Sequence, residues 1–523
     1  MSRTNMALLR VAATLPLLLL PVLAPRPAPA QDAGAGRLAA ALAQLDGLAA
    51  ETLQRTGIPG MAVGVVSRDQ VVYLKGFGGR EAGTGQAVDA DTVFQLASVS
   101  KPIASTVVAA LVGDGVARWD DRIIAHDPGF QMYDPWVTRE VTLRDMFAHR
   151  SGLPDHAGDL LEDLGYDRAE VLHRLRYQRP DSSFRSTYNY TNFGLTEAAV
   201  AAARAAGESW EDLSAERLYL PLGMTATSSR FADFAAAPNR ALLHVLVDGR
   251  YVPKYVRQPD AQSPAGGVSS TVRDLAQWMR LQLGGGRVDG RQIITADALA
   301  ATHVPQIVSN PPKDPAANRA GFYGLGWNVG YDDQGRVRWS HSGGFASGAA
   351  TAVYLVPAEQ LGIVVLTNAA PIGAPEALAA TFLDLALEGR VTRDWAAFLA
   401  PFFAAMAESP YGHGIDYTQP PPDPRLALPL ASYVGTYAND LYGDADVALE
   451  GDGLVLRLGP ARTAYPLWHY DGDVFAYQPV GENAYSPSGV IFQVGPSQTA
   501  GSVTVENLDL NGQGTFTRPP LTR

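Results

Sequence analysis

A serine and a lysine three residues apart form the most reactive pattern in this chain. Lysine is scarce, with only four in 523 residues, and one of them, Lys101, follows Ser98 by three positions. That spacing places both side chains on one face of a helix. A buried amine loses solvation, so its pKa falls toward neutrality, and it can then take the serine proton and activate the hydroxyl toward a carbonyl. Arginine stays protonated and could not replace it.

The residues around this pair favour a chemical role. Alone, Ser-x-x-Lys is a weak signal, because Ser98 could equally cap a helix and Lys101 could lie on its solvated face. The flanking segments, Phe-Gln-Leu-Ala at 94–97 and Pro-Ile-Ala at 102–104, leave little polar surface for a solvated lysine. We therefore expect Lys101 to be buried beside Ser98.

Two further segments could complete a site. Tyr190 and Asn192 belong to Tyr-Thr-Asn, where a phenol can relay a proton and an amide can hold a substrate carbonyl. His341 precedes Ser-Gly-Gly at a predicted strand end, where Gly343 and Gly344 let a ligand approach the backbone. Each segment is weak alone, since most tyrosines are structural and a lone histidine is more often a satisfied surface or core residue.

In this order, the three segments resemble the serine β-lactamase and penicillin-binding protein superfamily, above all class C β-lactamases and related esterases and D-amino-acid peptidases. The family's Ser-x-x-Lys matches residues 98–101, its Tyr-x-Asn matches 190–192, and its Lys-Thr-Gly-like motif matches 341–343. The flanking segments 147–154, 264–268 and 323–327 are also similar to family segments. The resemblance extends over about residues 35–390.

The resemblance implies a role for each residue. Ser98 is acylated, and Lys101 and Tyr190 share the proton transfers, with the choice of base left open between them. Asn192 contacts the substrate amide, and the backbone N–H groups of Ser98 and Gly344 form the oxyanion hole. His341, Gly343 and Gly344 line the substrate site, whereas we expect His149, in the 147–154 segment, to be structural.

One departure from the family concerns the substrate. β-lactamases mostly carry lysine where His341 stands, and a neutral histidine attracts a substrate carboxylate less strongly. We therefore predict hydrolysis of a small-molecule or peptide amide or ester, with peptidase or esterase favoured over β-lactamase or D-Ala-D-Ala carboxypeptidase. A rival of another class is a non-hydrolytic sensor or binding protein with the same fold. The nine histidines are dispersed and cysteine is absent, so no metal or cofactor is predicted.

The elements around these residues predict an α+β fold, and the resemblance implies an antiparallel sheet flanked by helices with a helical subdomain. Two apolar runs around a polar turn form a hairpin, and 116–260 is mostly helical, with amphipathic pieces at 168–176 and 193–206. The predicted strands are 61–66, 71–77, 336–342, 349–356 and 361–367. The other predicted helices are 35–56, 98–112, 269–283, 374–388 and 393–407.

A proline-rich stretch at 419–424 indicates a linker, followed by short alternating runs. The expected strands in this region are 447–449, 454–458, 474–477, 489–494 and 502–510. They predict a small all-β barrel that resembles lipocalin-like modules. We assign 1–30 to a signal peptide, 31–410 to the hydrolase domain, 411–429 to the linker and 430–523 to the barrel.

The first thirty residues have the pattern of an export signal. Arg3 and Arg10 precede a short apolar run, and Ala28-Pro29-Ala30 supplies small residues for cleavage. An uncleaved anchor is the alternative, although the run is short and interrupted by proline. We expect a periplasmic or secreted protein without disulfides and with no membrane span after signal removal. A homo-oligomer is left open. The net charge of −12 argues against nucleic acid as a partner.

Overall fold

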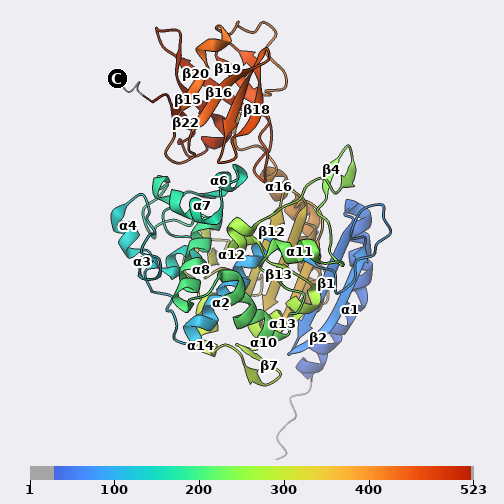
Figure 1. Ribbon diagram of the computed structural model, residues 1–523. Helices are drawn as coiled ribbons and strands as arrows, with labels where there is room; N and C mark the ends of the chain where they lie inside the picture. Colours follow the sequence, from blue (N-terminus) through green and yellow to red (C-terminus); the bar gives the residue numbers. More distant parts are fainter. Residues whose placement is uncertain (1–28, 520–523) are drawn as a thin grey trace, which may run out of the picture.

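The computed structural model describes residues 29–519, so nearly all of the predicted signal peptide lies outside the described residues. Helix α1 (Pro29–Thr56) comes first and begins before the predicted start at residue 35. It lies along the outside of the main sheet, beside α15 (Ala374–Glu388) (Figure 1). Within the described residues, no helix is both long and apolar enough to cross a bilayer.

The main sheet is antiparallel, with eight strands in the order β2-β1-β14-β13-β12-β11-β10-β9. Its bounds are β1 Gly60–Ser67, β2 Gln70–Gly78, β9 Ile307–Asn310, β10 Gly321–Tyr323, β11 Asn328–Tyr331, β12 Val337–Phe345, β13 Ala349–Val356 and β14 Leu361–Thr367. The hairpin predicted at 61–77 is confirmed as β1 paired with β2. Strand β1 pairs on its other side with β14.

The central strands are apolar on both faces because both faces are covered. Every residue of β1 and β14 is buried. Val63 and Val365 face the cluster made with α1 and α15, while Ala62 and Val364 face the cluster that holds the helices on the other side. Those helices are α2 (Ser100–Gly113) and α13 (Val272–Leu283).

The start of α13 differs from the prediction. Ser269 and Ser270 were expected to open a helix, but they form strand β6, which pairs with β3 (Phe94–Gln95). The helix is capped by Thr271, whose hydroxyl accepts the backbone N–H of Asp274. One capping residue is enough, which leaves the two serines free to pair with the strand that leads to Ser98.

The helical subdomain lies between β2 and β9 in the sequence and covers one side of the molecule (Figure 1). It contains α3 Ile123–His126, α4 Pro135–Glu140, α5 Leu143–Phe147, α6 Asp159–Asp163, α7 Arg168–Arg174, α8 Asn192–Ala206, α9 Trp210–Ser214, α10 Leu220–Leu222, α11 Phe231–Ala236 and α12 Ser263–Gly266. Around it lie the short pairs β4 Val245–Val247 with β5 Arg250–Val252 and β7 Arg287–Val288 with β8 Arg291–Gln292, and helix α14 Ala296–Ala300. Helix α8 is almost wholly buried and forms the centre of the subdomain.

The chain leaves the sheet through α15 and α16 (Trp395–Met406) and enters a C-terminal barrel. Its eight antiparallel strands follow in chain order: β15 Gly435–Tyr437, β16 Ala445–Glu450, β17 Gly453–Leu458, β18 Thr463–Asp471, β19 Val474–Tyr477, β20 Ser488–Val494, β21 Ala500–Val505 and β22 Thr515–Thr517. Two backbone hydrogen bonds between Ala438 and Thr517 join the first strand to the last and nearly close the barrel. The predicted fold class is confirmed.

Two predicted details of the barrel are wrong. The run expected at 502–510 ends as a strand at Val505 and continues as a 3-10 turn, Glu506–Leu508. Strands β15, β18 and β22 were not predicted at all. The barrel sits on α6 and α7 of the helical subdomain (Figure 1), where Tyr166 donates a hydrogen bond to the carbonyl of Tyr442 at 3.0 Å.

Candidate active site

Ser98 lies in a sharp turn between β3 and α2. The turn is a 3-10 segment, Ala97–Val99, so α2 itself begins at Ser100 and not at Ser98 as predicted. Ala97 has a φ of 47°, a left-handed conformation that costs a residue with a Cβ atom about 1 kcal/mol. Its side chain is fully buried, so the surrounding packing holds the strain that sets Ser98 at the end of the strand.

The amine of Lys101 has three polar neighbours. Its Nζ lies 3.1 Å from Ser98 Oγ, 2.6 Å from Asn192 Oδ1 and 3.0 Å from the carbonyl oxygen of Ala265. A neutral amine has two N–H donors and one lone pair, while an ammonium has three donors and no lone pair. With its two donors on Asn192 and Ala265, the neutral amine directs its lone pair at the Ser98 hydroxyl.

Burial makes that neutral form accessible. The Lys101 side chain is completely buried, as expected from its apolar flanks. Burial lowers the pKa of Lys101 from 10.5 to about 7, and the negative charge of Asp159 opposes this change only in part. A pKa near neutrality makes the free amine accessible at neutral pH, which is the requirement for a general base.

Tyr190 lies on the other side of the nucleophile. Its hydroxyl donates a hydrogen bond of 2.7 Å to Ser98 Oγ, and its ring centre lies 4.4 Å from Lys101 Nζ. Burial raises the pKa of Tyr190 well above its ordinary value, so the group remains a phenol. At neutral pH this side chain can therefore donate a proton to a neighbouring group.

His149 supports the segment that carries Tyr190. Its Nδ1 accepts the backbone N–H of Thr191 at 3.1 Å, and its ring centre lies 4.7 Å from that of Tyr190. Burial lowers the pKa of His149 well below its ordinary value, so the ring stays neutral. These contacts agree with the structural role expected for this residue.

The amide of Asn192 is engaged within the protein at both ends. Its oxygen accepts from Lys101, and its nitrogen donates to Asp159 Oδ2 at 2.8 Å. The same carboxylate oxygen is 2.8 Å from Nδ1 of His156 at the rim of the site. Asn192 therefore orients the lysine, a role that the sequence reasoning did not assign. Asp159 and His156 were missed, and no local pattern marks them.

His341 is buried in strand β12 and is neutral. Its Nδ1 donates to the carbonyl of Ser342 at 2.6 Å, and its Nε2 accepts from the hydroxyl of Tyr323 at 2.9 Å. Burial lowers the pKa of His341 to about 3. The position that β-lactamases mostly fill with a cationic lysine therefore carries no charge, and both ring nitrogens are already occupied.

Gly343 and Gly344 bring strand β12 against the nucleophile. A Cβ atom at Gly343 would meet the carbonyl oxygen of Leu96 and lie 2.9 Å from the backbone nitrogen of Ser98. No larger residue fits there, so the glycine is required for the close approach. Gly344 is exposed beside it, where its backbone can meet a ligand. The structure thus brings all seven predicted residues to the meeting point of β12, α2 and α8.

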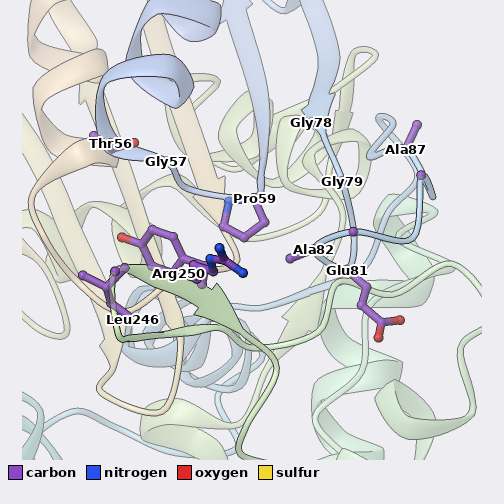
Figure 2. Close-up of a pocket in the computed structure, with 14 residues that line it drawn as sticks. Thr56, Gly57, Pro59, Gly78, Gly79, Glu81, Ala82, Ala87, Leu246 and Arg250 are labelled. Carbon is purple, nitrogen blue, oxygen red and sulfur yellow. The ribbon is translucent and has the colours of Figure 1, made fainter.

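A separate surface hollow of about 570 Å³ lies at the beginning of β1 (Figure 2). Its walls come from the ends of α1, β2 and the β4–β5 hairpin, with Glu81 and Arg250 as its charged side chains (Figure 2). None of the seven predicted residues lines it. This hollow is therefore separate from the reactive groups.

Comparison with known families gives the class of the protein. A family model described as Beta-lactamase matches residues 45–388, more than half of the chain, so the chain belongs to the β-lactamase family, as the resemblance implied. A second model, described as a domain of unknown function (DUF3471), matches residues 419–518 and therefore takes in the barrel strands.

Several known proteins are similar to this chain. Unguisins hydrolase ungD of Aspergillus violaceofuscus is 26% identical over 85% of this chain and 86% of its own length. Penicillin-binding protein 4 of Amycolatopsis lactamdurans is 29% identical over 60% of this chain and 81% of its own. The octameric penicillin-binding protein homologue from Pyrococcus abyssi shares the fold, with a TM-score of 0.57 and 18% identity over 88% of this chain and 97% of that chain.

Proposed function

We propose that the protein is a serine hydrolase that cleaves an amide or ester through an acyl-enzyme on Ser98. The observation that carries this proposal is the buried amine of Lys101, which lies 3.1 Å from Ser98 Oγ and also contacts the oxygens of Asn192 and Ala265. Tyr190 contacts the same oxygen from the other side. A nucleophile with a base and an acid at hydrogen-bond distance is the arrangement that acyl transfer requires.

Acylation begins when Lys101 takes the Ser98 proton while Oγ attacks the substrate carbonyl carbon. The carbonyl oxygen becomes an oxyanion, for which the backbone N–H groups of Ser98 and Gly344 are the proposed donors. The tetrahedral intermediate collapses when the bond to the leaving group breaks. The leaving nitrogen or oxygen takes a proton from the Tyr190 phenol, and the lysine ammonium returns a proton to the tyrosine. Water then attacks the acyl-enzyme while Lys101 takes its proton; the bond between the acyl carbon and Ser98 Oγ breaks, Oγ takes the proton back from the lysine ammonium, and the acid leaves.

The electrostatics favour substrates without a carboxylate beside the scissile bond. His341 is neutral, and the carboxylates Asp155 and Asp159 are close enough to raise the pKa of Tyr190. A peptidase or esterase activity therefore ranks above β-lactam hydrolysis. One relative is named a hydrolase and another, from Escherichia coli, a D-alanyl-D-alanine-carboxypeptidase/endopeptidase, and both names agree with acyl transfer. We also propose export to the periplasm or medium, on the pattern of residues 1–30.

A substrate panel tests the proposal. Wild type and Ser98→Ala are incubated with p-nitrophenyl acetate, a D-amino-acid p-nitroanilide and a chromogenic cephalosporin. We expect turnover of the ester or anilide that the variant loses, and a mass increase on Ser98 in quenched wild type. Slow stoichiometric labelling without turnover would instead support the sensor hypothesis. Turnover that survives in Ser98→Ala would overturn both.

A further inference from the structure

A loop of the C-terminal barrel reaches the candidate active site. This loop, residues 478–487, joins β19 to β20. The Asp163 carboxylate accepts the backbone N–H of Glu482 at 2.8 Å and that of Asn483 at 2.9 Å, as well as the Asn483 side-chain amide at 2.8 Å. Gly481, with a φ of 117°, allows the approach, because a Cβ atom there would collide with that carboxylate.

The same loop contacts the opposite side of the site. The carboxylate of Glu482 accepts the backbone N–H groups of Ala346 and Ser347, which form the turn between β12 and β13. Its Oε2 also lies 4.0 Å from Nε of Arg257, a guanidinium that is bonded to Glu162 at 2.6 Å. Only 17% of the Glu482 side chain is exposed. Burial raises the pKa of Glu482 to about 7, and the ionised carboxylate makes charge-assisted bonds to these N–H groups that are stronger than neutral ones.

The two places that the loop contacts, Asp163 and the 346–347 turn, lie close in sequence to residues of the candidate site. Asp163 is the last residue of the five-residue helix α6, and Asp159, its first residue, holds the amide of Asn192. Ala346 follows Gly344, the proposed oxyanion donor, by two residues. Two adjacent residues of the barrel loop, at 482 and 483, therefore bridge the lysine side of the site to its oxyanion side.

We propose that Glu482 is a positioning residue through which the C-terminal barrel sets the distance between strand β12 and the Ser98–Lys101 pair. This inference rests on the proposed function, because it assigns the barrel a part in the same acyl transfer. Complete loss of one oxyanion donor typically lowers kcat by about 10² to 10³. If the 346–347 turn relaxes and displaces Gly344 slightly, only part of this effect is expected, so kcat should fall about tenfold.

The test compares Glu482→Ala with Glu482→Gln in the full chain, using p-nitrophenyl acetate as the probe. We expect kcat of Glu482→Ala to fall about tenfold with KM changed less than twofold, because Glu482 acts through the 346–347 turn. Glu482→Gln keeps an acceptor oxygen and should recover most of the rate. Hydrogen exchange of the 346 and 347 amides should accelerate in Glu482→Ala without a general loss of protection.

The control is Glu450→Ala, on strand β16 of the same barrel, where the carboxylate pairs with Arg457. It should match wild type in rate and exchange. Asp163→Asn tests the other anchor and should also lower kcat. It serves as the second variant if Glu482→Ala does not fold. The proposal is overturned if Glu482→Ala keeps kcat within twofold of wild type, or if its exchange rises throughout the chain. A wild type without Ser98-dependent turnover would refute the proposed function instead, and the exchange at 346 and 347 would still report on the contact.

Discussion

Replacing Lys101 with methionine removes the amine but keeps an unbranched side chain of similar length. An ordinary lysine with a pKa of 10.5 is about 0.03% neutral at pH 7, whereas a pKa of about 7 makes about half of the population neutral. Burial thus raises the concentration of free base by about a thousandfold. General-base catalysis typically contributes about 10² to 10⁴ in rate, so we expect Lys101→Met to lower kcat/KM by about 10³.

The same change carries a stability signature that a solvent-exposed lysine would lack. The folded chain has a pKa of about 7 at this position, below the 10.5 expected when unfolded, so between these values the unfolded chain binds a proton that the folded chain does not. The stabilising contribution of Lys101 is therefore present above pH 10.5 and is lost as the pH falls to about 7. Its full size is about 5 kcal/mol.

The assay is urea unfolding of wild type and Lys101→Met at pH 7, 8.5 and 10, with activity measured on the same samples. The methionine variant cannot titrate at this position, so the difference between the two proteins isolates Lys101. We expect the wild type to gain stability relative to the variant as the pH rises. A constant difference across this range, or a variant that keeps a tenth of wild-type kcat/KM, would refute the assignment of Lys101 as the base.

Two further substitutions test other parts of the site. Tyr190→Phe removes the 2.7 Å hydrogen bond to Ser98. We expect kcat for the anilide to fall about 10²-fold or more, because its leaving group needs a proton, and kcat for p-nitrophenyl acetate to fall less. Equal losses of kcat for the two substrates would contradict an acid role. Gly343→Ala places a methyl group against Leu96 and 2.9 Å from the backbone nitrogen of Ser98. Calorimetry should therefore show about 1–3 kcal/mol of destabilisation, and activity should be lost. A fully active, equally stable variant would show that the close approach is unnecessary.

The reactive pair could be predicted because its signal is local. Ser98 and Lys101 are three residues apart, and their apolar neighbours indicated burial before any tertiary contact was known. The groups that tune the lysine come from elsewhere in the chain. Asp159 acts through Asn192, and the carbonyl of Ala265 is 164 residues from the amine that it accepts. A backbone carbonyl has no side-chain signature, so only the fold identifies it.

The missed strands have similar reasons. Strand β18 contains Pro466, which lowers the strand signal, yet that residue pairs with Val455 in the ladder. Ser269 and Ser270 resembled helix-capping residues because side-chain preference alone does not distinguish a cap from a strand that pairs with a distant partner. The proposed role of Glu482 could not be predicted, because this residue belongs to the C-terminal barrel and contacts the 346–347 turn only through the tertiary fold.

Strand pairing in the main sheet constrains how the protein is made. The β1–β2 hairpin leaves the ribosome early, but Met61 of β1 pairs with Thr367 of β14, 306 positions later (367 minus 61). Until that partner is synthesised, the apolar β1 has an open edge, and such long-range pairing folds slowly. Ser98 is synthesised shortly after β1, whereas β12 is synthesised shortly before β14. The proposed active site therefore stays incomplete until most of the chain has been synthesised.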